Sequence, residues 1–161
     1  MTLWQTSRRL CLQRSARMGL AWMSVLAWPA RAQKMESGQL LSLSDMLKPI
    51  TQGARVLEQG ISITAPILAD NGSLVPMTVL VQSPMTAAEH VTHLYLLSQR
   101  NPVTRMAVFH LGPWNGRAEI STRVRLAGSQ VVVALARLSS GEFRYAQMDM
   151  IVTESACVDA S

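Results

Sequence analysis

The chain has 161 residues, a formal net charge of +5 and two cysteines. Five of its 15 Lys and Arg residues, but none of its 10 Asp and Glu residues, lie within residues 1–32, so residues 33–161 are formally neutral. A neutral chain offers no electrostatic support for a nucleic-acid partner, and we exclude that class. Residues 33–161 are long enough for one domain with a proper core.

Residues 1–32 have the pattern of a secretory signal peptide. Five arginines accompany an apolar run at 18–28, and Ala30-Arg31-Ala32 matches a small-residue cleavage site. The apolar run is shorter than the roughly 20 residues that a membrane-spanning helix needs. Ser7-Arg8-Arg9-Leu10-Cys11-Leu12 resembles a twin-arginine signal. We therefore expect a periplasmic protein that has no membrane span after processing.

The segment that follows the signal predicts one short helix. Its apolar residues are Leu40, Leu41, Leu43, Met46 and Leu47. Ser44 and Asp45 are the candidate N-caps, and we expect the helix to end before Pro49.

From Gly60 onward the apolar residues alternate with polar ones, which is typical of half-buried strands. The clearest case runs from Arg117 to Leu126. Seven strands are expected, at residues 61–65, 75–82, 91–97, 106–111, 117–126, 130–138 and 143–152. Asn71-Gly72, Asn101-Pro102, Gly112-Pro113, Asn115-Gly116 and Ser139-Ser140-Gly141 mark turns. The predicted fold is all-β: an immunoglobulin-like antiparallel β-sandwich over residues 33–152 with a short N-terminal helix, with a small barrel as the alternative.

The histidines give no sign of a metal site. His90 and His93 are three residues apart, so in a strand they would point to opposite faces, and His110 lies in another segment. Ordinary polar or half-buried histidines explain all three. The chain also lacks a nucleophile-elbow, phosphate-loop or metalloprotease motif. We therefore predict no catalytic residue, no cofactor and no metal.

Two surface features are open to more than one interpretation. Arg117, Arg123 and Arg125 form a basic stripe on one face of the predicted strand, and a solvated surface explains it most simply. Trp114 lies in a loop, where it either packs on the sandwich or contacts a partner.

Cys157 carries the strongest chemical signal. Cleavage after residue 32 removes Cys11, and a lone cysteine in an oxidising compartment indicates intermolecular pairing or a free reactive thiol. Cys157 lies in residues 153–161, where the strand pattern has ended. Five residues after Val152, it could stand about 17 Å from the domain on an extended chain.

The neighbours of Cys157 do not activate it. Residues 153–161 contain Glu154 and Asp159 but no Lys, Arg or His, so nothing in the segment stabilises a thiolate. With a pKa of about 8.5, only a few per cent of the thiol would be ionised at neutral pH. A carrier whose client enzymes supply the activation tolerates this, whereas an enzyme that acts alone does not.

Three segments resemble the SoxY family of bacterial sulfur-oxidation carriers: residues 65–86, residues 101–138, and "VTESACV" at 152–158. The resemblance implies an immunoglobulin-like domain that pairs with a SoxZ-like subunit and bears a C-terminal arm. The arm cysteine, here Cys157, would carry sulfur compounds such as thiosulfate between client enzymes that resemble SoxXA, SoxB and SoxCD. The chain itself would then be a carrier and not an enzyme.

The arm departs from the Gly-Gly-Cys-Gly-Gly pattern of that family. Its flanks are Ser155, Ala156, Val158 and Asp159, which resemble SoxY-related proteins with an Ala-Ala-Cys-Ile-Glu-like arm. Glycine adopts positive φ angles and passes through a narrow channel, whereas Val158 is stiff and Asp159 is charged. We therefore expect the carrier principle to hold but not the standard thiosulfate cycle. The alternative function is a non-catalytic binding or assembly module in which Cys157 forms an interchain disulfide.

Overall fold

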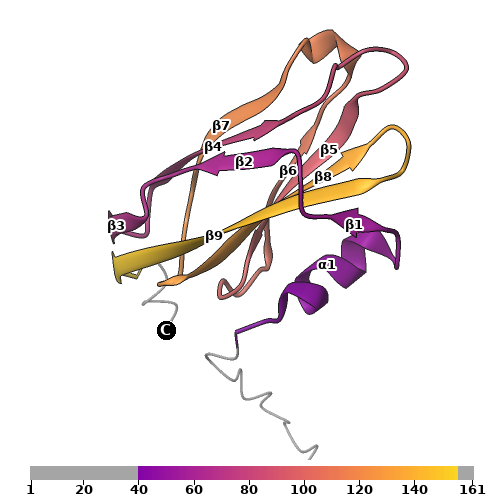
Figure 1. The fold of residues 1–161 in the computed structure, drawn as a ribbon. Coiled ribbons are helices and arrows are strands. Elements are labelled where there is room, and N and C mark those ends of the chain that lie inside the picture. The colour runs from indigo at the N-terminus through magenta and orange to yellow at the C-terminus, as the bar shows by residue number, and fades with distance from the viewer. Residues whose placement is uncertain (1–39, 156–161) are drawn as a thin grey trace, which may run out of the picture. The chain divides into compact units, whose positions relative to one another are not determined.

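The computed structural model describes residues 40–155, which fold into two β-sheets and one α-helix (Figure 1). The elements are α1 (Leu43–Thr51), β1 (Val56–Leu57), β2 (Ile61–Thr64), β3 (Leu68–Asn71), β4 (Val75–Val81), β5 (Val91–Ser98), β6 (Arg105–His110), the 3₁₀ turn η1 (Pro113–Asn115), β7 (Ala118–Val124), β8 (Gln130–Leu138) and β9 (Phe143–Glu154). The only α-helix in this range is too short to cross a bilayer. The predicted signal peptide lies outside the described residues.

The two sheets confirm the sandwich that the alternation predicts. One sheet has the order β1-β9-β8-β5-β6, with β3 also paired to β9, and the other has the order β2-β4-β7. In β7, Ala118 and Val124 are buried while Glu119 and Arg123 are exposed, as the two-residue period requires. All seven predicted strands are present.

Two short strands were not predicted. β1 and β3 both pair in parallel with β9, at its beginning and at its end. Leu68, Ala69, Asp70 and Asn71 were expected to belong to a connection and its turn, yet they form β3. The two short strands pair with both ends of the outer edge of β9, where backbone groups would otherwise be unpaired.

The helix differs from its predicted bounds. Its N-cap is Ser42, whose hydroxyl accepts a hydrogen bond from the Asp45 N–H, and not Ser44 or Asp45. Pro49 lies inside the helix, which continues to Thr51. The Pro49 nitrogen has no hydrogen to donate to the carbonyl of Asp45, so the helix lacks one backbone hydrogen bond in its last turn.

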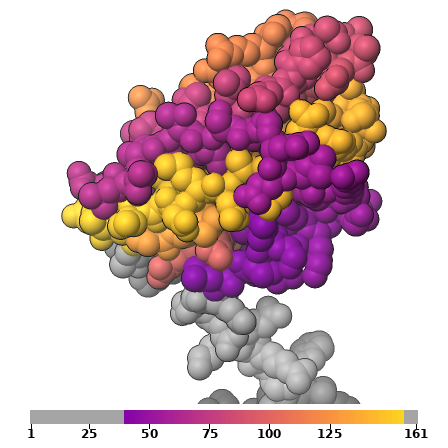
Figure 2. All heavy atoms as spheres, in the orientation of Figure 1, coloured from indigo at the N-terminus to yellow at the C-terminus, as the bar shows by residue number. Residues whose placement is uncertain are grey.

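The core has two layers on either side of the larger sheet (Figure 1). Between the sheets, the fully buried residues include Val79, Leu94, Leu96, Val132, Ala134 and Met150. On the opposite face, α1 buries Met46 and Leu47 against Leu97, Val133, Leu135 and Phe143. Figure 2 shows that the yellow atoms of β9 nevertheless reach the surface. This strand leads directly to the predicted arm.

Candidate substrate-carrying arm and the neighbouring cleft

The end of β9 is held firmly by the segment around β3. The Thr153 hydroxyl donates a 2.6 Å hydrogen bond to the Asp70 carbonyl, and the Gly72 N–H donates a 2.8 Å bond to the Glu154 carbonyl. Thr153 and Glu154 are therefore part of the sheet, and the prediction that the chain is unpaired from residue 153 is wrong for these two. The arm begins at Ser155.

Ser155 is anchored to the loop between β7 and β8. Its hydroxyl donates a hydrogen bond to the Ala127 carbonyl. The other predicted site residues, Ala156, Cys157, Val158 and Asp159, lie outside the described residues. Because Cys157 follows Ser155 by two positions, their Cα atoms can be at most about 7 Å apart. The anchored base thus shortens the expected reach of the thiol.

Asn101 connects this loop to the hairpin between β5 and β6. Its side-chain Nδ2 donates a 2.7 Å bond to the Arg125 carbonyl, and its Oδ1 accepts a 2.9 Å bond from the Ala127 N–H. The Gln130 side chain donates a further bond of 3.2 Å to the same oxygen. Ala127 is therefore bonded both to Asn101 and to Ser155 at the base of the arm.

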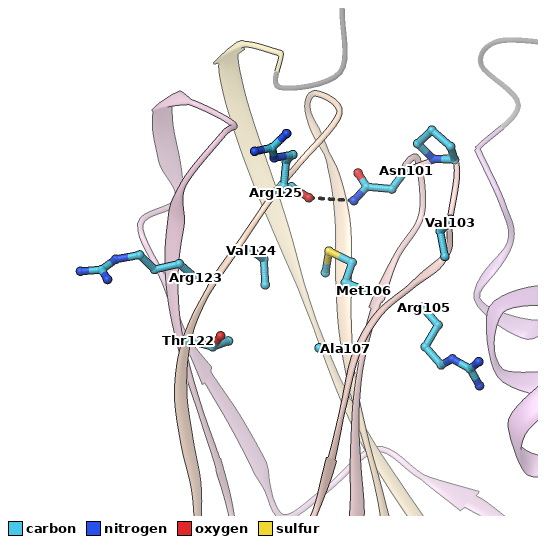
Figure 3. A pocket seen from close by; sticks show the side chains of 10 residues that line it. Asn101, Val103, Arg105, Met106, Ala107, Thr122, Arg123, Val124 and Arg125 are labelled. Carbon is cyan, nitrogen blue, oxygen red and sulfur yellow. Dashed lines mark hydrogen bonds between the residues drawn. The ribbon is translucent and has the colours of Figure 1, made fainter. Parts of the chain in front are cut away.

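A cleft of about 380 Å³ opens next to this network, between the edge strands β6 and β7. Its lining residues are Asn101, Pro102, Val103, Arg105, Met106, Ala107, Thr122, Arg123, Val124 and Arg125. In Figure 3, Met106, Val124 and Thr122 point into the space between the two strands, whereas Arg105 and Arg123 project outward on opposite sides. Arg125 lies at the end of the cleft near the β7–β8 loop (Figure 3). The cleft thus has an apolar floor, and Arg125 is the arginine that lies at its end.

The basic stripe divides into one paired and two unpaired arginines. Arg117 forms a 2.9 Å ion pair with Glu119. Among residues 40–155, no carboxylate forms an ion pair with Arg123, Arg125 or Arg105. The stripe is exposed, as predicted, and its unpaired members line the cleft together with Arg105, whose place there has no signal in the sequence. Asn101 was interpreted only as a turn residue.

Two of the histidines, His93 and His110, are in contact, which the sequence analysis does not predict. His93 on β5 lies directly opposite His110 on β6, and their ring centroids are 4.5 Å apart. The buried Nδ1 atom of His93 has no hydrogen-bond partner among the described residues. Partial burial lowers the pKa of His93, and the nearby His110 and Arg137 lower it further. In the described part of the chain, no three His, Cys, Asp or Glu side chains are grouped to hold a metal ion.

Trp114 does not pack into the sandwich. It lies on η1 and is 84% exposed, so the first of its two interpretations is wrong. Its ring covers the backbone of Gly112, where an added Cβ would come within 2.4 Å of the ring. Any larger residue at position 112 would require the exposed indole to move.

Comparison with known proteins assigns this arrangement to a family. The model of the family "Sulfur oxidation protein SoxY" matches residues 48–157, a range that ends at Cys157. The solved structure of the sulfur carrier protein SoxY from Chlorobium limicola f. thiosulfatophilum is 27% identical with a TM-score of 0.58, and the alignment covers 69% of this chain and 96% of that one. No curated protein matches the chain.

A second similarity concerns the fold alone. The superoxide reductase (neelaredoxin) of Ignicoccus hospitalis is 15% identical with a TM-score of 0.52, and the alignment covers 70% of this chain and 99% of that one. This likeness shows that the sandwich occurs with more than one function. The family match covers well over half of the sequence, and the chain therefore belongs to the SoxY family of sulfur oxidation proteins.

Proposed function

We propose that this protein is a periplasmic carrier that holds a sulfur compound covalently on Cys157 and presents it to enzymes of sulfur oxidation. The observation that carries the proposal is the family match, which extends through the end of β9 to Cys157. The likeness to a sulfur carrier protein from Chlorobium supports it. The signal pattern of residues 1–32 supports the periplasmic location.

The base of the arm suits this role because it is fixed by hydrogen bonds two residues before the thiol. Thr153 and Glu154 are bonded to the segment at β3, and Ser155 is bonded to Ala127. A carrier needs a thiol that reaches the active sites of other proteins from a defined starting point. The short distance from Ser155 to Cys157, about 7 Å at most, means that a client enzyme must approach this end of the sandwich closely.

Attachment of a reduced sulfur compound to the thiol is an oxidation, and thiosulfate serves as the example. The cysteine sulfur forms a bond to the outer sulfur of thiosulfate, and the pair gives up two electrons and one proton. The electrons require an acceptor, which we assign to a client enzyme that resembles SoxXA, with a hydrolase that resembles SoxB acting later. The chain itself supplies the thiol and no electron acceptor.

A SoxZ-like subunit is the partner that we propose for the domain. Leu68 on β3 and Ile151 on β9 lie opposite each other and are 54% and 53% exposed, and Ile67 beside them is 66% exposed. Three adjacent exposed aliphatic residues support an interaction with another protein, because exposure of a contiguous apolar patch to water is unfavourable in an isolated chain. Ile151→Asp should weaken co-purification with the partner, while Val103→Asp, at an exposed apolar residue elsewhere, should not.

Mass spectrometry of the protein from cells that oxidise reduced sulfur compounds tests the carrier function. We expect a fraction of the Cys157 peptide to carry added sulfur atoms or sulfonate groups, and Cys157→Ser to abolish both the adducts and growth on the sulfur compound that the cells oxidise. The matched control is Cys157→Ser combined with Ser155→Cys. It keeps one thiol but moves it about 7 Å back along the arm, so loading should fall sharply.

Protein isolated from the same cells distinguishes a sulfur carrier from an assembly module in which Cys157 forms an interchain disulfide. A stable interchain disulfide of full stoichiometry on a non-reducing gel would favour the assembly module. An unmodified thiol in active cells, together with normal growth of Cys157→Ser, would refute the carrier.

A further inference from the structure

His93 and His110 bring two imidazole rings together on one face of the larger sheet. They lie opposite each other on the antiparallel strands β5 and β6, and their ring centroids are 4.5 Å apart with an interplanar angle of 66°. Residues that are directly opposite in such a pair have Cβ atoms about 4.5–5.5 Å apart, so the register of the strands keeps the two side chains together. The sheet itself, and not a loop, therefore positions the pair.

The separation of the rings fits two ligands of one metal ion. A metal–nitrogen bond of about 2.0 Å places the metal about 3.2 Å from the ring centre, so two rings at a right angle about the metal have centres about 4.5 Å apart. Two rings on opposite sides of a metal would instead have centres about 6 Å apart. The observed distance matches adjacent coordination positions and does not match a linear arrangement.

Neither ring is committed to another partner in the way that the third histidine is. The buried Nδ1 atom of His93 has no hydrogen-bond partner within residues 40–155, and an unsatisfied buried polar atom is rare enough in native structures to indicate a missing water or ion. His110 is exposed, and rotation about its terminal side-chain bond is soft, so it can turn a ring nitrogen toward an ion beside His93. His90, by contrast, lies 3.0 Å through its Nδ1 from the Thr86 carbonyl oxygen.

The surroundings of the pair decide the class of ion and the strength of the site. Imidazole is a good ligand for zinc, nickel and copper, and Cu²⁺ binds a given nitrogen site most tightly of the three. In the described part of the chain, no third His, Cys, Asp or Glu side chain joins the pair, so water must complete the coordination. Arg137 on β8 lies opposite His93, and its positive charge opposes a cation. We therefore expect a weak site that exchanges its ion.

We propose that His93 and His110 bind one Cu²⁺ ion through one ring nitrogen each, in adjacent coordination positions. This site is separate from the network that supports the arm. His93 lies five residues before Ser98 on β5, a distance of roughly 17 Å along an extended strand. Ser98 accepts a 2.9 Å hydrogen bond from the Asn101 N–H and marks the near end of that network. The inference is therefore independent of the carrier function.

Titration of the processed Cys157→Ser protein with Cu²⁺ tests the site, since this variant removes the thiol as a competing ligand. One equivalent of Cu²⁺ should give an electron paramagnetic resonance spectrum with coupling to two imidazole nitrogens. His110→Gln should weaken binding by about tenfold or more, because even residues that only position a ligand contribute that much to metal affinity. His90→Gln is the matched control, because it removes an imidazole outside the pair and should leave the affinity unchanged. Calorimetric titration with glycine as a competing chelator measures the affinities.

The charge of Arg137 provides a second measurement. Arg137→Gln should tighten Cu²⁺ binding by about two- to fivefold, the size expected for one charge at a partly exposed site. Circular dichroism checks that each variant is folded.

Equal Cu²⁺ affinity in His110→Gln and the parent protein would overturn the proposal, and so would coupling to a single nitrogen. An Arg137→Gln protein that binds Cu²⁺ no more tightly would also contradict it, since the ion would then lie away from His93. None of these outcomes depends on adducts at Cys157, so a failure of the carrier function would be seen separately.

Discussion

His93 is a single side chain whose ionisation depends on its place in the sheet. Its ring stacks on Tyr95 from the same strand, with centroids 5.9 Å apart, and meets the edge of His110 from the neighbouring strand. Partial burial disfavours the protonated ring, and His110 and Arg137 add like-charge repulsion, so the pKa of His93 is lowered. The folded protein therefore keeps this residue neutral at a pH where the unfolded chain protonates it.

This arrangement predicts an acid-sensitive fold. A lowered pKa means that the unfolded state binds the proton more tightly than the folded state does. The contribution of neutral His93 to the free energy of unfolding is therefore fully present above the unfolded pKa of about 6.5, and it is lost as the pH falls through the lower folded pKa. Between pH 7.5 and pH 5.5, the urea midpoint of unfolding should fall less for His93→Phe than for the unaltered protein. In NMR titrations, His110→Gln should raise the pKa of His93 toward its ordinary value. A His93 pKa at or above that value in the unaltered protein would contradict the prediction.

Among the elements, α1 contributes a separate part of the core. Met46 and Leu47 pack on the face of the larger sheet that lies away from the smaller one, against Leu97, Val133 and Leu135. The helix is capped by Ser42 and ends where Gln52 adopts a left-handed φ of 51°. A helix of this length is not stable alone in water, so its packing on the sheet holds it in place.

Truncation of one core residue of α1 tests that packing. Leu47→Ala should lower the free energy of unfolding by about 2–5 kcal/mol, because it leaves a cavity beneath the helix. Leu40→Ala, at a residue that is 53% exposed, should change the stability by less than about 0.5 kcal/mol. Denaturant titration measures both. Equal losses in the two variants would show that the helix does not bury Leu47 as described.

At the scale of the whole molecule, the charge of the protein depends on its first 32 residues. The full sequence has an isoelectric point near 10.0, while residues 33–161 carry ten basic and ten acidic residues. If residues 1–32 are removed, the neutral remainder has no strong field with which to attract partner proteins over long distances. We therefore expect partner recognition to depend on local surface features of the sandwich.

Removal of the signal predicts a large change in isoelectric point. Protein recovered from the periplasm should begin at Gln33 by intact mass and focus near neutral pH. Replacing Arg8 and Arg9 together by lysine should leave the precursor in the cytoplasm if the export is of twin-arginine type. Arg14→Lys, a matched change outside the pair, should be exported normally. Normal export of both variants would contradict the twin-arginine assignment.

Local sequence patterns were sufficient to predict those features of the fold that depend only on neighbouring residues. The alternation in Arg117 to Leu126 predicts β7 and its two faces, because a strand presents successive side chains to opposite sides. Even the His93–His110 contact could have been predicted: folding the chain symmetrically about Asn101-Pro102 places residue 93 opposite residue 110. The turn alone does not show this contact, which depends on the register of the strands around it.

The pairing of β3 with β9 had no local signal. These strands are far apart in sequence, and Leu68 to Asn71 show no clear alternation. The same holds for Asn101, whose partners Arg125 and Ala127 lie in another hairpin. Such contacts depend on which sheet edges the fold brings together, a property of the topology and not of any segment.

The sequence by itself determined that the chain is a β-sandwich with a lone cysteine beyond its last strand, because alternation and cysteine count are properties of neighbouring residues. Only the tertiary structure decided that the arm begins at Ser155, since hydrogen bonds from β3 and from the β7–β8 loop fix the chain up to that residue. It also decided that residues of β6 and β7 line one cleft, because the edges of two different sheets must meet to form it.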